Sequence, residues 1–205
     1  MHGLGVGQTD RGRKRNNNED YMFIDNELGL YIVSDGMGGH AAGEVASKSA
    51  VNSVVRQIKS QRPLLDRVKN KIEGISKVVR LAEKALVEAC NDVYQLAKSK
   101  QNLAGMGSTL TLFLIVDEKA VMAHVGDTRL YLLRAGEVHL LSNDHTMAAE
   151  MVRKGIISLE ESRGHRMSNV LTRTVGTHEA VQVDTLLIDI FPEDRFLLCS
   201  DGLSE

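Results

Sequence analysis

The sequence predicts an α+β domain built on antiparallel sheets. Strand-like segments outnumber helical ones, and several of them are joined by short turns, as in β-hairpins. The helical segments follow one another along the chain and do not alternate with strands, which argues against a doubly wound α/β fold. A chain of 205 residues suits one domain with a sizeable core, so we expect a single domain over residues 1–205.

The first expected elements form a hairpin. Residues 2–9 have the character of a short strand weakened by glycines, and the polar residues 10–18 predict a loop. Residues 21–25 and 30–34 predict two strands, and residues 26–29 between them predict a turn. Acidic residues stand immediately before the first strand and immediately after the second.

Two helices are expected next. The glycine-rich residues 36–43 are too flexible for regular structure, and residues 44–59 have one small or apolar face, which predicts a helix. Residues 65–98 predict one long helix that covers a sheet or pairs with its neighbour, because their apolar positions recur at steps of four and three. Gly74 is a weak point within this helix. The apolar positions are Val68, Ile72, Ile75, Val79, Ala82, Leu86, Ala89, Val93 and Leu96.

The second half of the chain is mostly strand-like. The expected strands are residues 108–116, 120–125, 129–134, 138–141, 181–190 and 195–200. Turns are expected at Ala135-Gly136-Glu137 and at Pro192-Glu193-Asp194. Between these strands, residues 146–155 predict a short helix and residues 156–169 an irregular polar segment.

The composition argues against several kinds of protein. The net charge of −2 argues against a nucleic-acid binder that relies on a strong basic field. The two cysteines, Cys90 and Cys199, form no CxxC pair, so we expect reduced core thiols in a cytoplasmic protein and no cysteine-based zinc site. The N-terminus lacks the apolar core of a signal peptide, and no apolar run is long enough to span a membrane.

The acidic residues are the most informative feature. Asp20 stands at the start of an expected strand, whereas Asp35, Asp127 and Asp201 each follow an apolar run. Strand-end carboxylates that converge at one edge of a sheet would suit hard cations such as Mg²⁺ or Mn²⁺. Each aspartate alone is better explained as the start of a turn, because Asp-Gly is common turn chemistry.

Two neighbouring features are less specific. The GMGG stretch follows a strand and precedes a helix, but it lacks the spacing of a dinucleotide-binding loop and the lysine-serine pair of a P-loop. Arg15 could hold two phosphate oxygens, although charge alone does not separate it from the other basic residues of the loop.

Seven motifs in order resemble the bacterial branch of the metal-dependent protein phosphatases of type 2C. The resemblance extends along the whole chain. The motifs are Arg15-Asn16-Asn17-Asn18-Glu19-Asp20, Ser34-Asp35-Gly36-Met37-Gly38-Gly39-His40, Gly107-Ser108-Thr109, His124-Val125-Gly126-Asp127-Thr128-Arg129, Asp144-His145-Thr146, Leu171-Thr172-Arg173 and Ser200-Asp201-Gly202-Leu203.

The resemblance implies a four-layer sandwich of two antiparallel sheets, with a helix pair on each outer face and two metal ions at one end. In that family pattern, Asp35 bridges both ions, Glu19 and the carbonyl of Gly36 bind one, and Asp201 binds the other. Asp127 matches a residue of a third, weaker ion site. Residues 146–169 match a variable flap that borders the cleft.

The remaining roles implied by the resemblance are those of the reacting groups. Asp20 holds water near the ions, and Arg15 binds the substrate phosphate. A hydroxide between two divalent ions would attack the phosphorus of phosphoserine or phosphothreonine in a protein, without a covalent phosphoenzyme. The leaving alkoxide needs a proton, for which His40 is a candidate. A cysteine phosphatase is excluded, because no arginine lies six residues after Cys90 or Cys199.

The resemblance also leaves alternatives open. Family chains continue beyond the Asp201-Gly202-Leu203 motif with a helix and a strand that carry a further Asp ligand. We therefore expect one ion site to lack a carboxylate, which leaves open whether the chain as given is active. A catalytically impaired phosphoprotein-binding or regulatory module of the same fold is the alternative. A nuclease-like metallohydrolase is disfavoured by the near-neutral charge. The implied partners are phosphorylated proteins and a cognate Ser/Thr kinase, with no nucleic acid and no membrane, and the implied state is a monomer.

Overall fold

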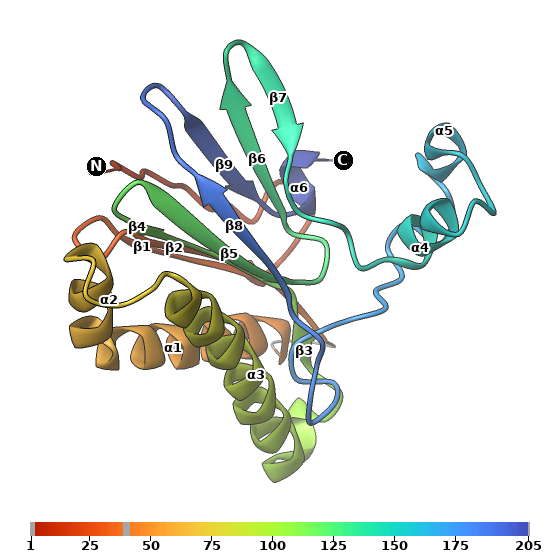
Figure 1. The fold of residues 1–205 in the computed structure, drawn as a ribbon. Helices are drawn as coiled ribbons and strands as arrows, with labels where there is room; N and C mark the ends of the chain where they lie inside the picture. The colour runs from red at the N-terminus through yellow and green to blue at the C-terminus, as the bar shows by residue number, and fades with distance from the viewer. Residues whose placement is uncertain (1–2, 39–41, 205) are drawn as a thin grey trace.

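A computed structural model describes residues 3–38 and 42–204, which form two antiparallel sheets with helices on the outer face of the larger one (Figure 1). The expected α+β class is confirmed. In spatial order, the larger sheet contains β1 (Asp20–Asp25), β2 (Leu30–Met37), β4 (Leu110–Val116), β5 (Lys119–Val125) and β8 (Asp184–Asp189), with the short β3 (Gly107–Ser108) paired to the end of β2. The smaller sheet contains β7 (Glu137–Leu140), β6 (Arg129–Arg134) and β9 (Arg195–Cys199).

The helices fall into two groups. Figure 1 shows α1 (Ala42–Ser60), α2 (Arg62–Lys69) and α3 (Ser76–Ser99) beneath the larger sheet. It also shows α4 (Met147–Arg153) and α5 (Leu159–Ser162) on a segment that projects to one side of the sandwich. Two further short pieces are the 3-10 turn η1 (Gln101–Leu103) and α6 (Asp201–Ser204), which begins one residue after β9. No helix among the described residues is both long and apolar enough to cross a membrane.

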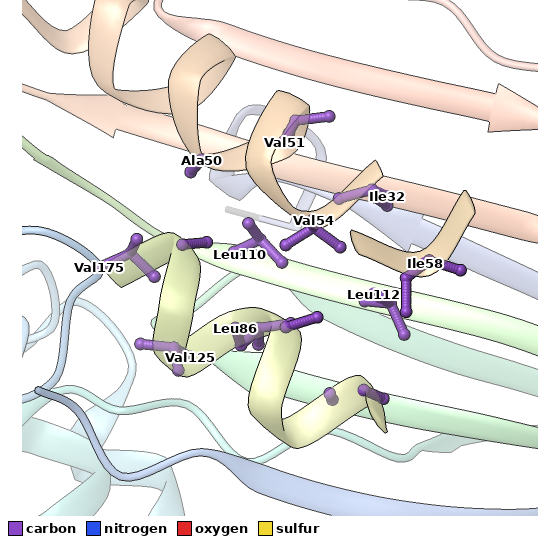
Figure 2. Packing of buried hydrophobic residues seen from close by; sticks show 14 of the residues in the cluster. Ile32, Ala50, Val51, Val54, Ile58, Leu86, Leu110, Leu112, Val125 and Val175 are labelled. Carbon is purple, nitrogen blue, oxygen red and sulfur yellow. The ribbon is translucent and has the colours of Figure 1, made fainter. Parts of the chain in front are cut away.

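Alternation along β4 divides the core into two layers. Leu112 and Leu114 are fully buried against the helices, whereas Phe113 points the other way and packs on Phe196 of β9, with 4.5 Å between ring centroids. This period of two is what a strand buried on both faces requires. Figure 2 shows the helix-side layer, to which α1, α3 and β4 contribute. Its labelled members include Ala50, Val51, Val54, Ile58, Leu86, Leu110 and Leu112.

The long helix expected over residues 65–98 is wrong, because the chain breaks between α2 and α3. Lys71 has a left-handed φ of 58°. Its N–H donates to the Val68 carbonyl at 2.9 Å, and the Ile72 N–H donates to the Arg67 carbonyl at 2.9 Å. This pair of bonds is a Schellman motif, which ends a helix. The apolar spacing continues across the break, but Ile72 is 66% exposed and does not join the core.

The strand expected over residues 2–9 is also wrong for the part that the structure describes. Residues 3–9 form no strand, and Leu4 and Val6 are 84% and 89% exposed. Side chains hold this segment beside the first hairpin: Asn26 Oδ1 accepts from the Gly5 N–H at 2.7 Å, and the Tyr31 hydroxyl donates to the Gly3 carbonyl at 3.1 Å.

Several boundaries differ from expectation by a few residues. β2 extends to Met37, so the glycine-rich segment begins within a strand. Thr146 caps α4, with its hydroxyl accepting from the Ala149 N–H at 3.2 Å. The segment 156–169 is not wholly irregular, because Ser158 and Glu161 form a capping box on α5. β8 is shorter than the expected strand over residues 181–190.

The outer face of the smaller sheet is apolar and open within the described part of the chain. Val138, Leu140 and Leu197 are 68%, 48% and 48% exposed, and Val138 and Leu197 line a groove of about 470 Å³. The helix pair that the resemblance implies for this face is not among the described residues, whereas α1 and α3 supply the pair on the larger sheet.

Candidate active site

The first hairpin places two carboxylates opposite each other. Asp20 begins β1, and its antiparallel partner in β2 is Asp35. Like charges directly opposite on a sheet repel, so this pairing costs stability unless something compensates. Asp35 is fixed by its backbone: its N–H donates to Thr109 Oγ1 at 2.9 Å, and its carbonyl accepts from the Thr109 N–H at 2.8 Å and from Ser108 Oγ at 2.7 Å.

The far end of the chain meets this hairpin. Ser200 Oγ donates to Asp20 Oδ2 at 2.6 Å, across 180 residues of sequence. Asp201 follows Ser200 and begins α6 with an exposed side chain. Asp127 follows β5 and is half-buried. The structure therefore brings four aspartates from separate segments to one rim, which we call the carboxylate rim: Asp20, Asp35, Asp127 and Asp201.

The charges of this rim act on its central member. Burial and, after it, the neighbouring charges of Asp20, Asp201 and Asp127 together raise the pKa of Asp35 to about 8. The shift means that the folded protein disfavours an ionised Asp35 when no cation balances the rim. A divalent cation would reverse this preference, because an ion is the largest local charge in such a site.

Glu19 and Gly36 lie beside the start of α1. The Glu19 carbonyl accepts from the Gly36 N–H at 3.1 Å and from Ser47 Oγ at 2.6 Å. A methyl group added to Gly43 would stand 2.5 Å from Glu19 Oε1 and 2.9 Å from the Gly36 carbonyl oxygen. Both oxygens therefore lie against Gly43 in the first turn of α1, where only a glycine fits.

The chemistry of these donors suits a hard cation, because all of them are carboxylate or carbonyl oxygens. In the described residues, no group of three His, Cys, Asp or Glu side chains has a geometry that would hold a metal ion. The carboxylate rim therefore gathers oxygen donors, but their side chains do not converge on one common point. Electrostatic coupling of Asp35 to three other carboxylates is the observation that supports cation binding here.

The two remaining residues of the expected site are Arg15 and His40. Arg15 lies exposed on the loop of residues 10–18. The end of this loop is ordered by Asn18, whose Oδ1 accepts from the Asp20 N–H at 3.1 Å. His40, the candidate proton donor, lies outside the described residues.

Two histidines form a buried polar network behind Asp127. His124 is fully buried, and burial lowers its pKa to about 4, so it is neutral. Its Nδ1 is 2.8 Å from Thr111 Oγ1, and its ring centroid is 4.8 Å from that of His145. His145 Nδ1 accepts from the Gly126 N–H at 3.1 Å, and its Nε2 is 3.2 Å from Asp184 Oδ2. Burial lowers the pKa of His145 as well.

A groove of about 460 Å³ lies beside Met37, two residues after Asp35. Its other wall is the loop after Leu171, and Arg173 in this loop donates to Asp184 Oδ1 at 2.7 Å. The groove is mixed in polarity, with side chains such as Thr174, Thr177 and His178 in its lining. Among the described residues, neither this groove nor the groove on the smaller sheet has a carboxylate in its lining.

Sequence reasoning gave no role to several residues that build the rim. Ser200 orients Asp20, Thr109 clamps the backbone of Asp35, and Ser47 holds that of Glu19. Their signal was adjacency: Ser200 precedes Asp201, and Thr109 belongs to a motif of the resemblance. Hydroxyl donors beside carboxylates are common in such sites, but only coordinates show which carboxylate each one serves.

Comparison with known proteins gives a consistent result. Residues 7–205 match the family model described as protein phosphatase 2C. The serine/threonine phosphatase stp of Listeria monocytogenes serovar 1/2a is 38% identical over 201 residues, covering 96% of this chain and 76% of the relative. Protein phosphatase PhpP of Streptococcus pneumoniae serotype 2 is 34% identical over 200 residues, covering 96% of this chain and 77% of the relative.

Solved structures agree with this result. The serine/threonine phosphatase PstP/Ppp of Mycobacterium tuberculosis is similar with a TM-score of 0.83 and 32% identity, over 96% of this chain and 77% of that one. A structure of the catalytic domain of PstP in complex with two manganese ions has a TM-score of 0.79 and 32% identity, over 96% of this chain and 76% of that one.

Proposed function

This chain belongs to the protein phosphatase 2C family, and from that premise we propose that it hydrolyses phosphoserine and phosphothreonine in proteins with divalent cations held at the carboxylate rim. The observation that supports this most directly is the convergence of Asp20, Asp127 and Asp201 on Asp35, from the first hairpin and two segments distant from it in sequence. The relatives that match are named as phosphatases, which disfavours a module without catalysis.

We assign the cation ligands as follows. Asp35 would be shared between two ions, Glu19 and the Gly36 carbonyl would bind one of these ions, and Asp201 would bind the other. Asp127 serves a third, weaker ion. Mg²⁺ or Mn²⁺ bound here would lower the pKa of water and balance the charge of the phosphoryl group. Binding would also favour the ionised form of Asp35, which burial and the neighbouring carboxylates oppose.

The other side chains of the site orient the reacting groups or transfer protons. Asp20, held by the Ser200 hydroxyl, accepts a hydrogen bond from the attacking water and orients it. Arg15 binds the phosphoryl oxygens, since a guanidinium matches two of them at once. His40 donates the proton that the departing serine or threonine oxygen requires. The groove beside Met37 receives the residues that flank the phosphorylated one, and residues 146–169 act as a flap.

The setting of the reaction follows from the same premise. We propose a monomeric enzyme of a single domain that acts in the cytoplasm and opposes a cognate serine/threonine kinase. The buried thiols Cys90 and Cys199 are free, which supports a reducing compartment.

The test is hydrolysis of p-nitrophenyl phosphate and of phosphoserine, phosphothreonine and phosphotyrosine peptides. We expect Mn²⁺-dependent turnover that EDTA abolishes, with little activity on phosphotyrosine. Asp35→Asn and Asp201→Asn should each lower kcat/KM at least a hundredfold, whereas Asp66→Asn on the exposed face of α2 should leave it unchanged. Turnover that persists in EDTA would contradict the proposal.

A further inference from the structure

The loop that carries Asp127 depends on the position of one glycine. Gly126 has a φ of +109°, and a methyl group added to it would lie 2.5 Å from Thr109 Cβ. Thr109 in turn makes backbone and side-chain bonds to Asp35 at 2.8 and 2.9 Å. Displacement of Gly126 would therefore move Asp127, its neighbour in sequence, and disturb the contact that fixes Asp35.

His145 holds this glycine on both sides. The Gly126 N–H donates to His145 Nδ1 at 3.1 Å, and the His145 N–H donates to the Gly126 carbonyl at 2.8 Å. Because Nδ1 accepts a hydrogen bond, the proton of the neutral ring is on Nε2. Nε2 lies 3.2 Å from Asp184 Oδ2 and also 3.2 Å from Arg173 Nη1, and Arg173 donates to the other oxygen of Asp184 at 2.7 Å.

The same histidine lies at the base of the segment 146–169. Its carbonyl accepts from the Thr172 N–H at 2.8 Å, and an antiparallel bridge joins the adjacent pair Thr146 and Leu171. The side chain of His145 is 1% exposed, so solvent does not replace these bonds. The base of the segment and the Asp127 loop consequently share one buried anchor.

We propose that His145 is a positioning residue that sets the place of Asp127 at the carboxylate rim and couples it to the base of the segment 146–169. The inference rests on the proposed function, because it assigns the rim to cations. A purely structural role would make all substitutions equivalent once the fold is intact. A positioning role requires the acceptor at Nδ1 in particular, since Nδ1 is the ring atom that accepts from the Gly126 N–H.

Two substitutions separate the two nitrogens of the ring. In His145→Asn, Oδ1 stands near the position of Nδ1 and keeps the acceptor for Gly126, but the contact with Asp184 is lost. In His145→Gln, the amide nitrogen stands near Nε2 and keeps the donor to Asp184, but the acceptor is lost. His139→Gln makes the same chemical change on β7, where the side chain is 46% exposed, and serves as the control.

The first measurement is the Mn²⁺ dependence of p-nitrophenyl phosphate hydrolysis. We expect His145→Gln to raise the Mn²⁺ concentration for half-maximal rate about tenfold with KM for the substrate unchanged, since loss of a positioning bond typically costs 10–100-fold in affinity. His145→Asn should stay within about threefold of the wild type. Equal effects of both substitutions, or no effect of His145→Gln, would overturn the proposal.

The second measurement needs no metal and no activity. Nitrogen NMR of the imidazole in EDTA should show His145 as the Nε2–H tautomer, and trypsin should cleave after Arg153 and Lys154 faster in His145→Gln than in His145→Asn. An Nδ1–H tautomer in the wild-type protein would overturn the inference even if a variant fails to fold. A wild-type protein without Mn²⁺-dependent turnover would contradict the proposed function, and these two readouts would still test His145.

Discussion

Replacing Asp35 with asparagine should stabilise the metal-free protein, although Asp35 is the central carboxylate of the proposed site. The pKa of Asp35 in the folded protein is raised from 3.8 to about 8, chiefly by burial and then by Asp20. The folded state therefore retains a proton that the unfolded chain has released. Wild-type stability is full below about pH 4 and is lost as the pH rises through about 8, whereas asparagine does not titrate.

The pKa of Asp35 sets an upper limit on this gain in the free energy of unfolding. A change of one in the pKa corresponds to about 1.4 kcal/mol, so the rise of the Asp35 pKa from 3.8 to about 8 gives an upper bound of roughly 6 kcal/mol. Asp35 is only partly buried and its surroundings relax around the charge, which raises the effective dielectric. We expect Asp35→Asn to add about 2 kcal/mol to the free energy of unfolding at pH 8, with the difference vanishing near pH 4.

The assay is urea unfolding of the two proteins in EDTA across this pH range. Asp25→Asn in the same hairpin is the matched control, because Asp25 accepts from the Leu28 N–H at 3.0 Å and pairs with Lys59 at 3.0 Å. These bonds lower the pKa of Asp25, the first of them most, so its loss should cost about 1 kcal/mol. Saturating Mn²⁺ should stabilise the wild type more than Asp35→Asn. A metal-free Asp35→Asn protein that is less stable than wild type at pH 8 would refute the reasoning.

Three further outcomes test other parts of the structure. Gly36→Ala would place a methyl group 2.0 Å from the Gly43 carbonyl oxygen, and we expect it to lower the free energy of unfolding by about 3 kcal/mol in urea titrations. Ser200→Ala removes the donor to Asp20 and should lower kcat about tenfold in steady-state assays, while the melting temperature stays close to that of the wild type. Leu112→Ala leaves a cavity at a fully buried position and should cost about 3 kcal/mol by calorimetry, without changing Mn²⁺ dependence.

Much of the fold could be predicted from local patterns. The turn at residues 26–29 and the hairpin turn at Ala135-Gly136 are local in sequence, so their residue types predict them. The break after α2 could not be predicted in the same way. It depends on a lysine at a left-handed position where glycine is usual, while the apolar spacing continues through Ile72 as if the helix were unbroken.

Sequence patterns could name candidate residues for the site but not the contacts that join them. Strand-end positions made Asp35, Asp127 and Asp201 candidates, because such residues gather at a sheet edge. The bond from Ser200 to Asp20 joins residues 180 positions apart, and no local pattern contains that information. The double contact between His145 and Gly126 likewise follows from packing of separate loops, so sequence reasoning could treat His145 only as a structural residue.

Because Asp20 and Asp35 lie opposite each other in the first hairpin, cation binding depends on the register of its two strands. If the two strands paired with a register shifted by one residue, one carboxylate would lie on the opposite face of the sheet and the pair would separate. A misaligned hairpin would thus be spared the repulsion between them but would also bind cations poorly. Cations present during refolding should therefore select the native alignment by mass action, and ion uptake can report how much of a preparation has paired correctly.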